Sequence, residues 1–218
     1  MRISKDGAFI ITLFSVVTLV ITIAYFLSFL NWHPLFIVIV WALFLFCLLF
    51  FRDPNRITLA KPDEIISPAD GRVIEITSEF EDIIHKSNAI RVSIFLSLFD
   101  VHINRIPISG TITYFNYIKG RFYPAFREKA SVANEQTVIG ISHNNNKVLL
   151  KQIAGVVARR ITCHIREGYT VEMGQRFGMI RFGSRVDLLL PENSELYIRK
   201  NDKVIGGETV IGRFNQSK

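Results

Sequence analysis

The sequence has only two cysteines among its 218 residues, which excludes a secreted domain held together by a disulfide framework. Cys47 lies in an apolar stretch and Cys163 in the more polar remainder, a placement consistent with the reducing cytoplasm. The sequence also lacks the cysteine and histidine spacing of a zinc site and any glycine-rich loop that would cradle phosphates. We therefore expect no metal ion and no separate phosphate-bearing cofactor.

Charged side chains are nearly absent from the first 51 residues, which contain only Arg2, Lys5 and Asp6. Residues 8–30 form an uncharged run of 23 residues, and a helix of that length reaches ~35 Å, enough to cross a ~30 Å hydrocarbon core. A second uncharged run, residues 35–51, follows a short polar break that contains Trp and Pro. The pattern predicts a membrane anchor over residues 1–51, built as a helical hairpin.

Basic residues flank this hairpin. Arg2 and Lys5 precede it and Arg52, Arg56 and Lys61 follow it, whereas the connecting loop has no Lys or Arg. The positive-inside rule therefore predicts a cell-membrane protein whose domain, residues 52–218, is cytoplasmic. A cleaved signal peptide fits poorly, because the first run is long and lacks a small-residue cleavage site. A re-entrant or interfacial hairpin remains the main alternative, because the second run is short.

From Arg52 onward the residues predict a mainly β domain. Short runs rich in β-branched and aromatic residues alternate with Gly, Pro and Asn, a spacing typical of a sandwich or a partly open barrel. Only residues 123–135 look helical or irregular. We expect strands at residues 71–77, 89–98, 111–118, 137–142, 147–153, 160–165, 179–190, 196–199 and 208–211, with a hairpin turn at residues 143–146.

One of these predicted strands contains an unexpected hydroxyl. Alternation over residues 180–190 places Ser184 in a row of apolar side chains. Gly183, the residue before it, weakens a strand interior and often marks a bulge or a close approach of the backbone. The pattern alone is also compatible with a small serine packed in the core beside a glycine bulge.

Two further segments carry candidate catalytic groups. Asp70 ends the turn at residues 67–71 and stands just before a strand, and His102 follows directly after the apolar strand at 89–98. Each has an ordinary structural explanation, since Asp-Gly is first a turn signal and a single histidine is more often structural. Together with Ser184 they would form an acid, a base and a nucleophile, a set defined by roles rather than by order in the chain.

From Phe51 to its end the chain resembles the phosphatidylserine decarboxylase family, in its short proenzyme form. Each matching segment is weak alone, but six in the same order are specific. They are Phe51-Arg-Asp-Pro-Asn-Arg56, Ser67-Pro-Ala-Asp-Gly71, Phe99-Asp-Val-His-Ile-Asn-Arg105, Lys129-Ala-Ser-Val-Ala-Asn-Glu135, Gln152-Ile-Ala-Gly-Val-Val-Ala-Arg-Arg160 and Gly178-Met-Ile-Arg-Phe-Gly-Ser-Arg-Val-Asp187.

The resemblance implies that the chain cleaves itself between Gly183 and Ser184. Ser184 would become a covalent pyruvoyl group, the cofactor, at the start of an α chain, residues 184–218. This chain would stay noncovalently bound to a β chain, residues 1–183. The pyruvoyl carbonyl would form a Schiff base with the amine of phosphatidylserine, so that loss of carbon dioxide gives phosphatidylethanolamine.

The resemblance also implies roles for other residues. Asp70 and His102 would assist cleavage or decarboxylation. Longer family members have a second histidine, implicated as the processing base, where this chain has Arg105. Either His102 serves both steps or Asp70 acts with it, and Arg105 is a candidate for binding the substrate's phosphate or carboxylate. The expected partners are phosphatidylserine and membrane lipids, and no nucleic acid, because the basic residues are scattered.

Two other functions are compatible with the residues. One is a membrane-bound serine hydrolase that uses Asp70, His102 and Ser184 in an intact chain. The other is a noncatalytic β-domain tethered to a membrane, since residues 203–212 are similar to hairpins of carrier-type sandwiches. If the chain is a decarboxylase, a lipid with a related amino-phospholipid headgroup, such as that of an archaeal-type lipid, is an alternative substrate.

Overall fold

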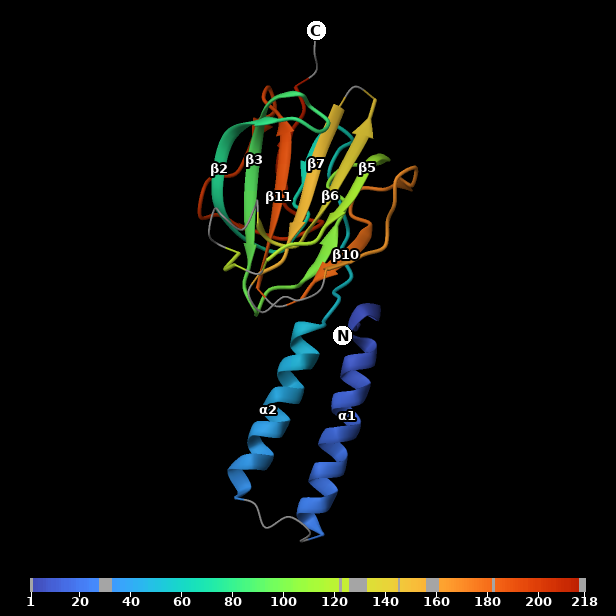
Figure 1. The fold of residues 1–218 in the computed structure, drawn as a ribbon, viewed down its shortest axis with the longest axis vertical. Coiled ribbons are helices and arrows are strands. Elements are labelled where there is room, and N and C mark those ends of the chain that lie inside the picture. Colours follow the sequence, from blue (N-terminus) through green and yellow to red (C-terminus); the bar gives the residue numbers. More distant parts are fainter. Residues whose placement is uncertain are drawn as a thin grey trace. The chain divides into compact units, whose positions relative to one another are not determined.

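The computed structural model describes residues 2–27, 33–121, 123–125, 133–144, 146–155, 161–181 and 183–215. The chain divides into two compact units, Met1–Asn55 and Arg56–Lys218. The first is helical and the second is built mainly from strands (Figure 1).

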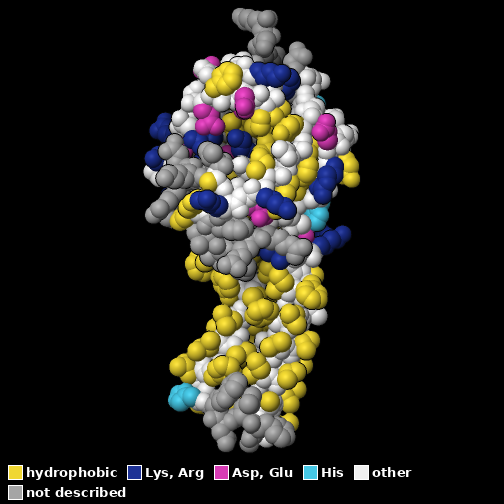
Figure 2. Space-filling view, in the orientation of Figure 1, with side chains coloured by type: hydrophobic (Ala, Val, Ile, Leu, Met, Phe, Trp, Pro, Cys, Tyr) yellow, Lys and Arg dark blue, Asp and Glu magenta, His cyan; other side chains and the backbone are white. Residues whose placement is uncertain are grey.

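The first unit is a hairpin of two apolar helices, α1 (Lys5–Phe26) and α2 (Pro34–Phe50). The side chain of Ser4 caps α1, and its backbone N–H donates to the carbonyl of Phe51 at 2.9 Å, which joins the two open ends of the hairpin. Exposed apolar side chains cover both helices (Figure 2). Helix α1 is long and apolar enough to span a membrane, whereas α2, with 17 residues, is shorter.

The helices differ slightly from the predicted apolar runs. Helix α1 begins three residues before residue 8, because Ser4 and Asp6 supply the first-turn cap, and it ends at Phe26. Residues 31 and 32 of the polar break lie outside the described residues, whereas His33 caps α2 and Pro34 is its first residue.

The second unit contains one large antiparallel sheet and two small ones. The large sheet has eight strands in the order β13-β2-β3-β11-β7-β6-β5-β9 and curls into a half-barrel (Figure 1). The small sheets have the orders β1-β14-β12 and β4-β10-β8. This architecture confirms the predicted mainly β, partly open barrel. The strands are β1 (Glu64–Ile66), β2 (Gly71–Glu81), β3 (Ser87–Leu96), β4 (Ile103–Arg105), β5 (Gly110–Ile118), β6 (Gln136–His143), β7 (Asn146–Ile153), β8 (Ile161–Cys163), β9 (Thr170–Val171), β10 (Arg176–Ile180), β11 (Ser184–Pro191), β12 (Glu195–Leu196), β13 (Lys203–Val204) and β14 (Val210–Arg213).

The hydrophobic core lies on one face of the large sheet. Val186 and Leu188 of β11 are fully buried there, in one cluster with Ile94 of β3 and Leu150 of β7. Residues from both small sheets, among them Phe177 and Ile211, belong to the same cluster. The small sheets therefore supply the second layer that buries the apolar face, as an amphipathic sheet requires.

Several strand predictions were wrong in their bounds; the strands predicted at 160–165 and 196–199, for example, are β8 (Ile161–Cys163) and β12 (Glu195–Leu196). The predicted strand 179–190 is two strands in different sheets, because Gly183 has a φ of 59° and a left-handed residue cannot continue a strand. The strand predicted at 89–98 corresponds to β3, which begins at Ser87 and ends at Leu96, and Leu98, inside the predicted range, is 39% exposed. The prediction for residues 123–135 falls largely outside the described residues.

Candidate active site

The candidate residues come from elements that meet at one end of the large sheet. Strand β2 begins just after Asp70, and β11 begins at Ser184, which lies opposite Leu96 at the end of β3. His102 follows six residues after Leu96. Strand β3 lies between β2 and β11, so the backbones of these two strands are roughly 10 Å apart.

Ser184 is fully buried at the first position of β11. Its side chain shares the core face of the sheet with Val186 and Leu188, as alternation predicted. Among the residues that the structure describes, its hydroxyl group has no hydrogen-bond partner. Leaving a buried polar group unsatisfied costs about 1–3 kcal/mol, so this hydroxyl is not explained as a stabilising contact.

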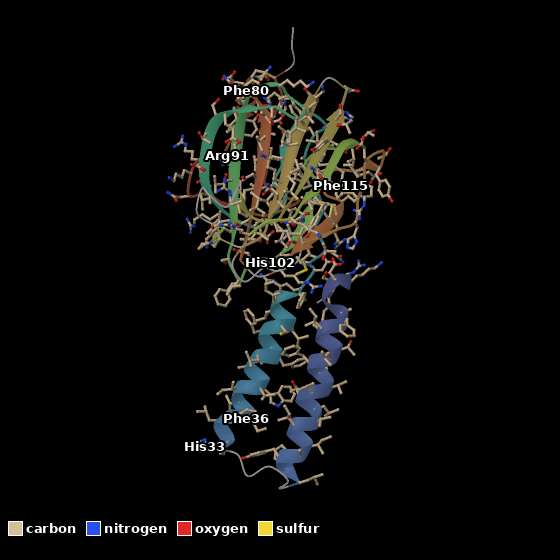
Figure 3. All side chains as sticks on the ribbon, viewed as in Figure 1. His33, Phe36, Phe80, Arg91, His102 and Phe115 are labelled. Carbon is tan, nitrogen blue, oxygen red and sulfur yellow. The ribbon has the colours of Figure 1, made fainter. Side chains whose placement is uncertain are left out.

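His102 is fully buried in the segment that leads from β3 to β4 (Figure 3). Its Nδ1 atom lies 3.0 Å from the carbonyl oxygen of Asp100. Because a carbonyl only accepts hydrogen bonds, the neutral imidazole carries its proton on Nδ1 and a lone pair on Nε2. This tautomer makes Nε2 the atom of His102 that can take a proton.

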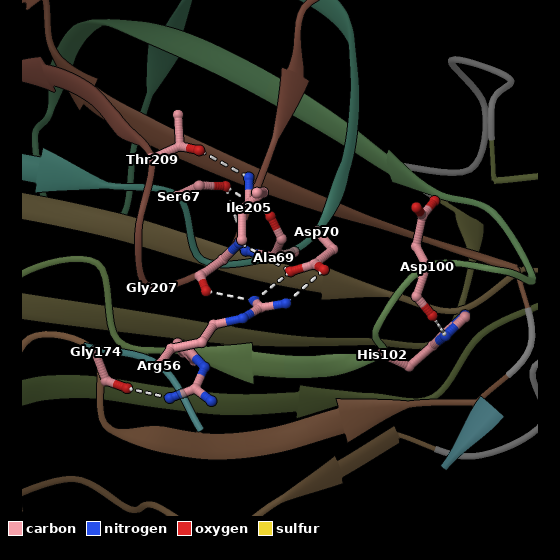
Figure 4. A network of polar contacts seen from close by, with 12 residues as sticks. Arg56, Ser67, Ala69, Asp70, Asp100, His102, Gly174, Ile205, Gly207 and Thr209 are labelled. Carbon is pink, nitrogen blue, oxygen red and sulfur yellow. Dashed lines mark hydrogen bonds and ion pairs between the residues drawn. The ribbon is translucent and has the colours of Figure 1, made fainter. Parts of the chain in front are cut away.

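The loop before His102 is held by Asp100. One carboxylate oxygen of Asp100 accepts from the backbone N–H of Ser97 at 2.7 Å and from the Ser97 hydroxyl at 2.6 Å. Figure 4 shows Asp100 and His102 joined through the backbone carbonyl. Asp100 therefore fixes the turn from which the imidazole is presented, a role that the sequence analysis did not assign to it.

Asp70 is bonded to an arginine (Figure 4). Arg56 donates to both of its carboxylate oxygens, and the backbone N–H of Gly206 donates to Oδ1 at 2.9 Å. The same guanidinium also donates to the carbonyl oxygen of Gly206. The resemblance implies that Asp70 assists the reaction together with His102; in the structure the hydrogen bonds of Asp70 go to Arg56 and Gly206.

We expect Asp70→Ala to lower the free energy of unfolding by about 3 kcal/mol, because it leaves the buried guanidinium of Arg56 without its carboxylate. The double variant Arg56→Met with Asp70→Leu should recover most of this loss, since neither charge then remains. Urea unfolding in detergent measures both effects. If the single and double variants lost the same free energy of unfolding, the loss would not come from the unpaired charge of Arg56.

Arg105 is buried in β4 and donates from Nη1 to the carbonyl oxygen of Gly174 at 3.0 Å. This hydrogen bond anchors the guanidinium within the fold rather than on its surface. A role for Arg105 in binding the substrate stays a prediction.

A chain of buried amides, which the sequence analysis missed, lies beside this site. The side chain of Gln152 donates to Oδ1 of Asn104 at 2.8 Å and accepts from the hydroxyl of Thr137 at 2.6 Å. Thr137 and Gln152 are opposite each other in β6 and β7, and Gln152 is also opposite Val186. The signal in the sequence was the polar Gln152 on the face of β7 that otherwise carries the buried apolar Val148 and Leu150.

Metal ligands and thiols are the other groups that could carry chemistry in the described part of the chain. There, no three or more His, Cys, Asp and Glu residues are grouped so that they could hold a metal ion. Burial raises the pKa of the Cys163 thiol, so that this thiol stays protonated near neutral pH. Ser184 is therefore a better candidate nucleophile than Cys163.

Comparison with known proteins gives consistent matches. The model of the family described as phosphatidylserine decarboxylase matches residues 43–212. Proteins named phosphatidylserine decarboxylase proenzyme are similar along most of their length. One from Magnetococcus marinus is 42% identical over 188 residues, 86% of each chain. One from Salinibacter ruber is 48% identical over 172 residues, which cover 78% of this chain and 76% of the relative.

Proposed function

Because this chain belongs to the phosphatidylserine decarboxylase family and is an enzyme of that type, we propose that it is a proenzyme that cleaves itself between Gly183 and Ser184. The pyruvoyl group formed from Ser184 would then serve the decarboxylation of phosphatidylserine to phosphatidylethanolamine. The observation that carries the proposal is the buried hydroxyl of Ser184, without a partner among the described residues, directly after a left-handed glycine.

The proposed cleavage uses only this chain and one water molecule. The Ser184 hydroxyl attacks the carbonyl carbon of Gly183, the C–N bond breaks, and the nitrogen takes up the proton, which leaves an ester. Loss of the proton on Cα of residue 184 then expels the carboxylate of Gly183 and leaves a dehydroalanine. Water replaces its nitrogen, ammonia leaves, and a pyruvoyl group remains at the start of residues 184–218.

The surroundings of Ser184 suit these steps. A pyruvoyl group has fewer heavy atoms than the serine residue it replaces, so it fits the same space. Burial against the core keeps competing water from the ester. When present, the group supplies an electrophilic carbonyl for the substrate's amine and an electron sink for decarboxylation.

We assign proton transfer to Nε2 of His102, because its Nδ1 is committed to the Asp100 carbonyl. Asp70 is the alternative or additional proton acceptor, and Arg105 is the candidate ligand for an anionic group of the headgroup.

Strand pairing and ion pairs support a stable noncovalent α/β pair after cleavage. Strand β11 would belong to the α chain and is paired along its length with β3 and β7 of the β chain. On the face opposite Ser184, Arg185 of the α chain donates to the hydroxyl of Ser93 at 2.8 Å and forms an ion pair with Glu75 at 3.8 Å, both in the β chain. Arg185 and Ser93 are buried, so the first residues of the α chain stay fixed when the backbone is cut.

Membrane attachment fits a lipid substrate. We propose that the helical hairpin anchors the enzyme in the cell membrane with the catalytic domain on the cytoplasmic side. Support comes from the length of α1 and from the basic residues that flank the hairpin. The net charge of +6 on residues 52–218 favours work at an anionic bilayer surface.

Denaturing electrophoresis with mass spectrometry tests this function. We expect two fragments, residues 1–183 and 184–218, the smaller with a blocked N-terminus that borohydride reduces. If a preparation that decarboxylates phosphatidylserine contained only the intact chain, the proposal would be contradicted. An intact chain labelled by a fluorophosphonate would indicate a serine hydrolase instead.

A further inference from the structure

We propose that Gly155 and Asn134 position the carbonyl group of Gly183 for attack by the Ser184 hydroxyl. This inference rests on the self-cleavage proposed above. Both residues lie in segments whose role in that reaction was not apparent from the sequence.

Gly155 lies directly against the carbonyl group of the bond to be cut. A Cβ atom built on Gly155 would overlap the carbonyl oxygen of Gly183, and on another side it would lie 3.4 Å from Cβ of Ala125. By contrast, a Cβ built on Gly183 would meet no atom within 4 Å. Gly183 is therefore required for its backbone angle, whereas Gly155 is required for the space that the carbonyl oxygen occupies.

Asn134 holds the backbone next to Gly155. Its side-chain Nδ2 donates to the carbonyl oxygens of Ala154 at 2.6 Å and Tyr123 at 2.7 Å, and its Oδ1 accepts from the Tyr123 N–H at 2.8 Å. The N–H of Ala154 in turn donates to the carbonyl of Glu135 at 2.9 Å. The residue before Gly155 is thus tied at both its N–H and its carbonyl.

The backbone at Gly155 therefore lies in a fixed position against the carbonyl oxygen of Gly183. A nucleophile must approach a carbonyl carbon within a narrow range of directions, and a displacement of about 1 Å can cost roughly 100-fold in rate. Gly155 sets how closely the carbonyl oxygen of Gly183 can approach the backbone of residue 155, and Asn134 keeps that backbone in place. The two are positioning residues, since the bond-making atoms belong to Gly183 and Ser184.

The test measures the first-order rate of self-cleavage after cell-free synthesis of the full chain into phospholipid vesicles, counting only the protease-resistant, folded fraction. We expect Gly155→Ala to slow cleavage by about 100-fold or more. Hydroxylamine, which cuts esters, should release no fragment from the accumulated precursor, because the block precedes ester formation.

Gly212→Ala is the matched control. A Cβ there would also overlap a backbone carbonyl oxygen, that of Glu195, in the small sheet formed by β1, β14 and β12. Its folded fraction should cleave at the wild-type rate. Equal slowing in the two variants would show a general effect of strain and overturn the inference.

Asn134→Ala gives a second test that adds no atom next to the carbonyl. We expect at least tenfold slower cleavage of the folded fraction, again without a hydroxylamine-sensitive ester. Wild-type cleavage in either Gly155→Ala or Asn134→Ala overturns the inference, and so does accumulation of an ester. If the wild-type chain itself is not cut at Gly183–Ser184, the proposed function fails instead.

Discussion

Replacing Ser184 with alanine is expected to leave one uncut chain of 218 residues with no decarboxylase activity. Alanine keeps the small volume and the strand position but removes the only atom that can attack the Gly183 carbonyl in the proposed route. Stability should change little or increase, because the lost hydroxyl is buried without a partner among the described residues. Electrophoresis, thermal unfolding and a carbon dioxide release assay measure the three outcomes.

Ser194→Ala is the control for this experiment. Ser194 is also buried, its hydroxyl also has no partner among the described residues, and it lies after β11 at the other end of that strand. It should be cut and active like the wild type. Cleavage of Ser184→Ala, or full activity in its intact chain, would remove Ser184 from the mechanism.

Replacing His102 with alanine is expected to slow cleavage, turnover or both by about 100- to 10,000-fold, the usual contribution of a positioned general acid or base. The carbonyl of Asp100 holds the proton on Nδ1 and leaves Nε2 as the basic atom, and alanine removes that atom. A pulse-chase experiment measures cleavage, and turnover per mole of the small fragment measures decarboxylation separately. Slow self-cleavage together with normal decarboxylation would assign His102 to self-cleavage alone.

His143→Ala serves as the matched control, because His143 is the last residue of β6, at the end of the strands of the large sheet opposite to Ser184. It should change neither rate. Normal cleavage together with normal turnover in His102→Ala would exclude His102 from the reaction and leave Asp70 as the candidate base.

The fold was predictable where strands are long enough to show alternation. Strands such as β3 and β7 have ten and eight residues, and their apolar faces are visible in the sequence. Strands β9 and β13 have two residues each, too few to show a period, and they went unpredicted. The break between β10 and β11 was hidden because the alternation of apolar residues continues across it from Ile180 to Val186, and the left-handed backbone of Gly183 cannot be deduced from composition.

The candidate site was predictable only in part. Ser184 stands out because a hydroxyl interrupts an apolar row, and this signal is local. The pairing of Asp70 with Arg56 and Gly206 joins parts of the chain up to 136 residues apart, which no periodicity reveals. The sequence does not mark out Gly155, because its importance lies in the atom it faces, the carbonyl oxygen of Gly183.

The chain crosses from one sheet to another between Ile180 and Ser184, and this crossing would favour cleavage over rejoining of the two ends. Before the cut, the peptide bond keeps the two ends at bonding distance. Afterwards residue 184 stays paired opposite Leu96, while Gly183 remains attached only to the chain leading back to β10, in the other sheet. Rejoining would require the freed end to lose its new conformational freedom, and the amine that once closed the bond has left as ammonia. Maturation would therefore be irreversible, and it would need no external source of energy.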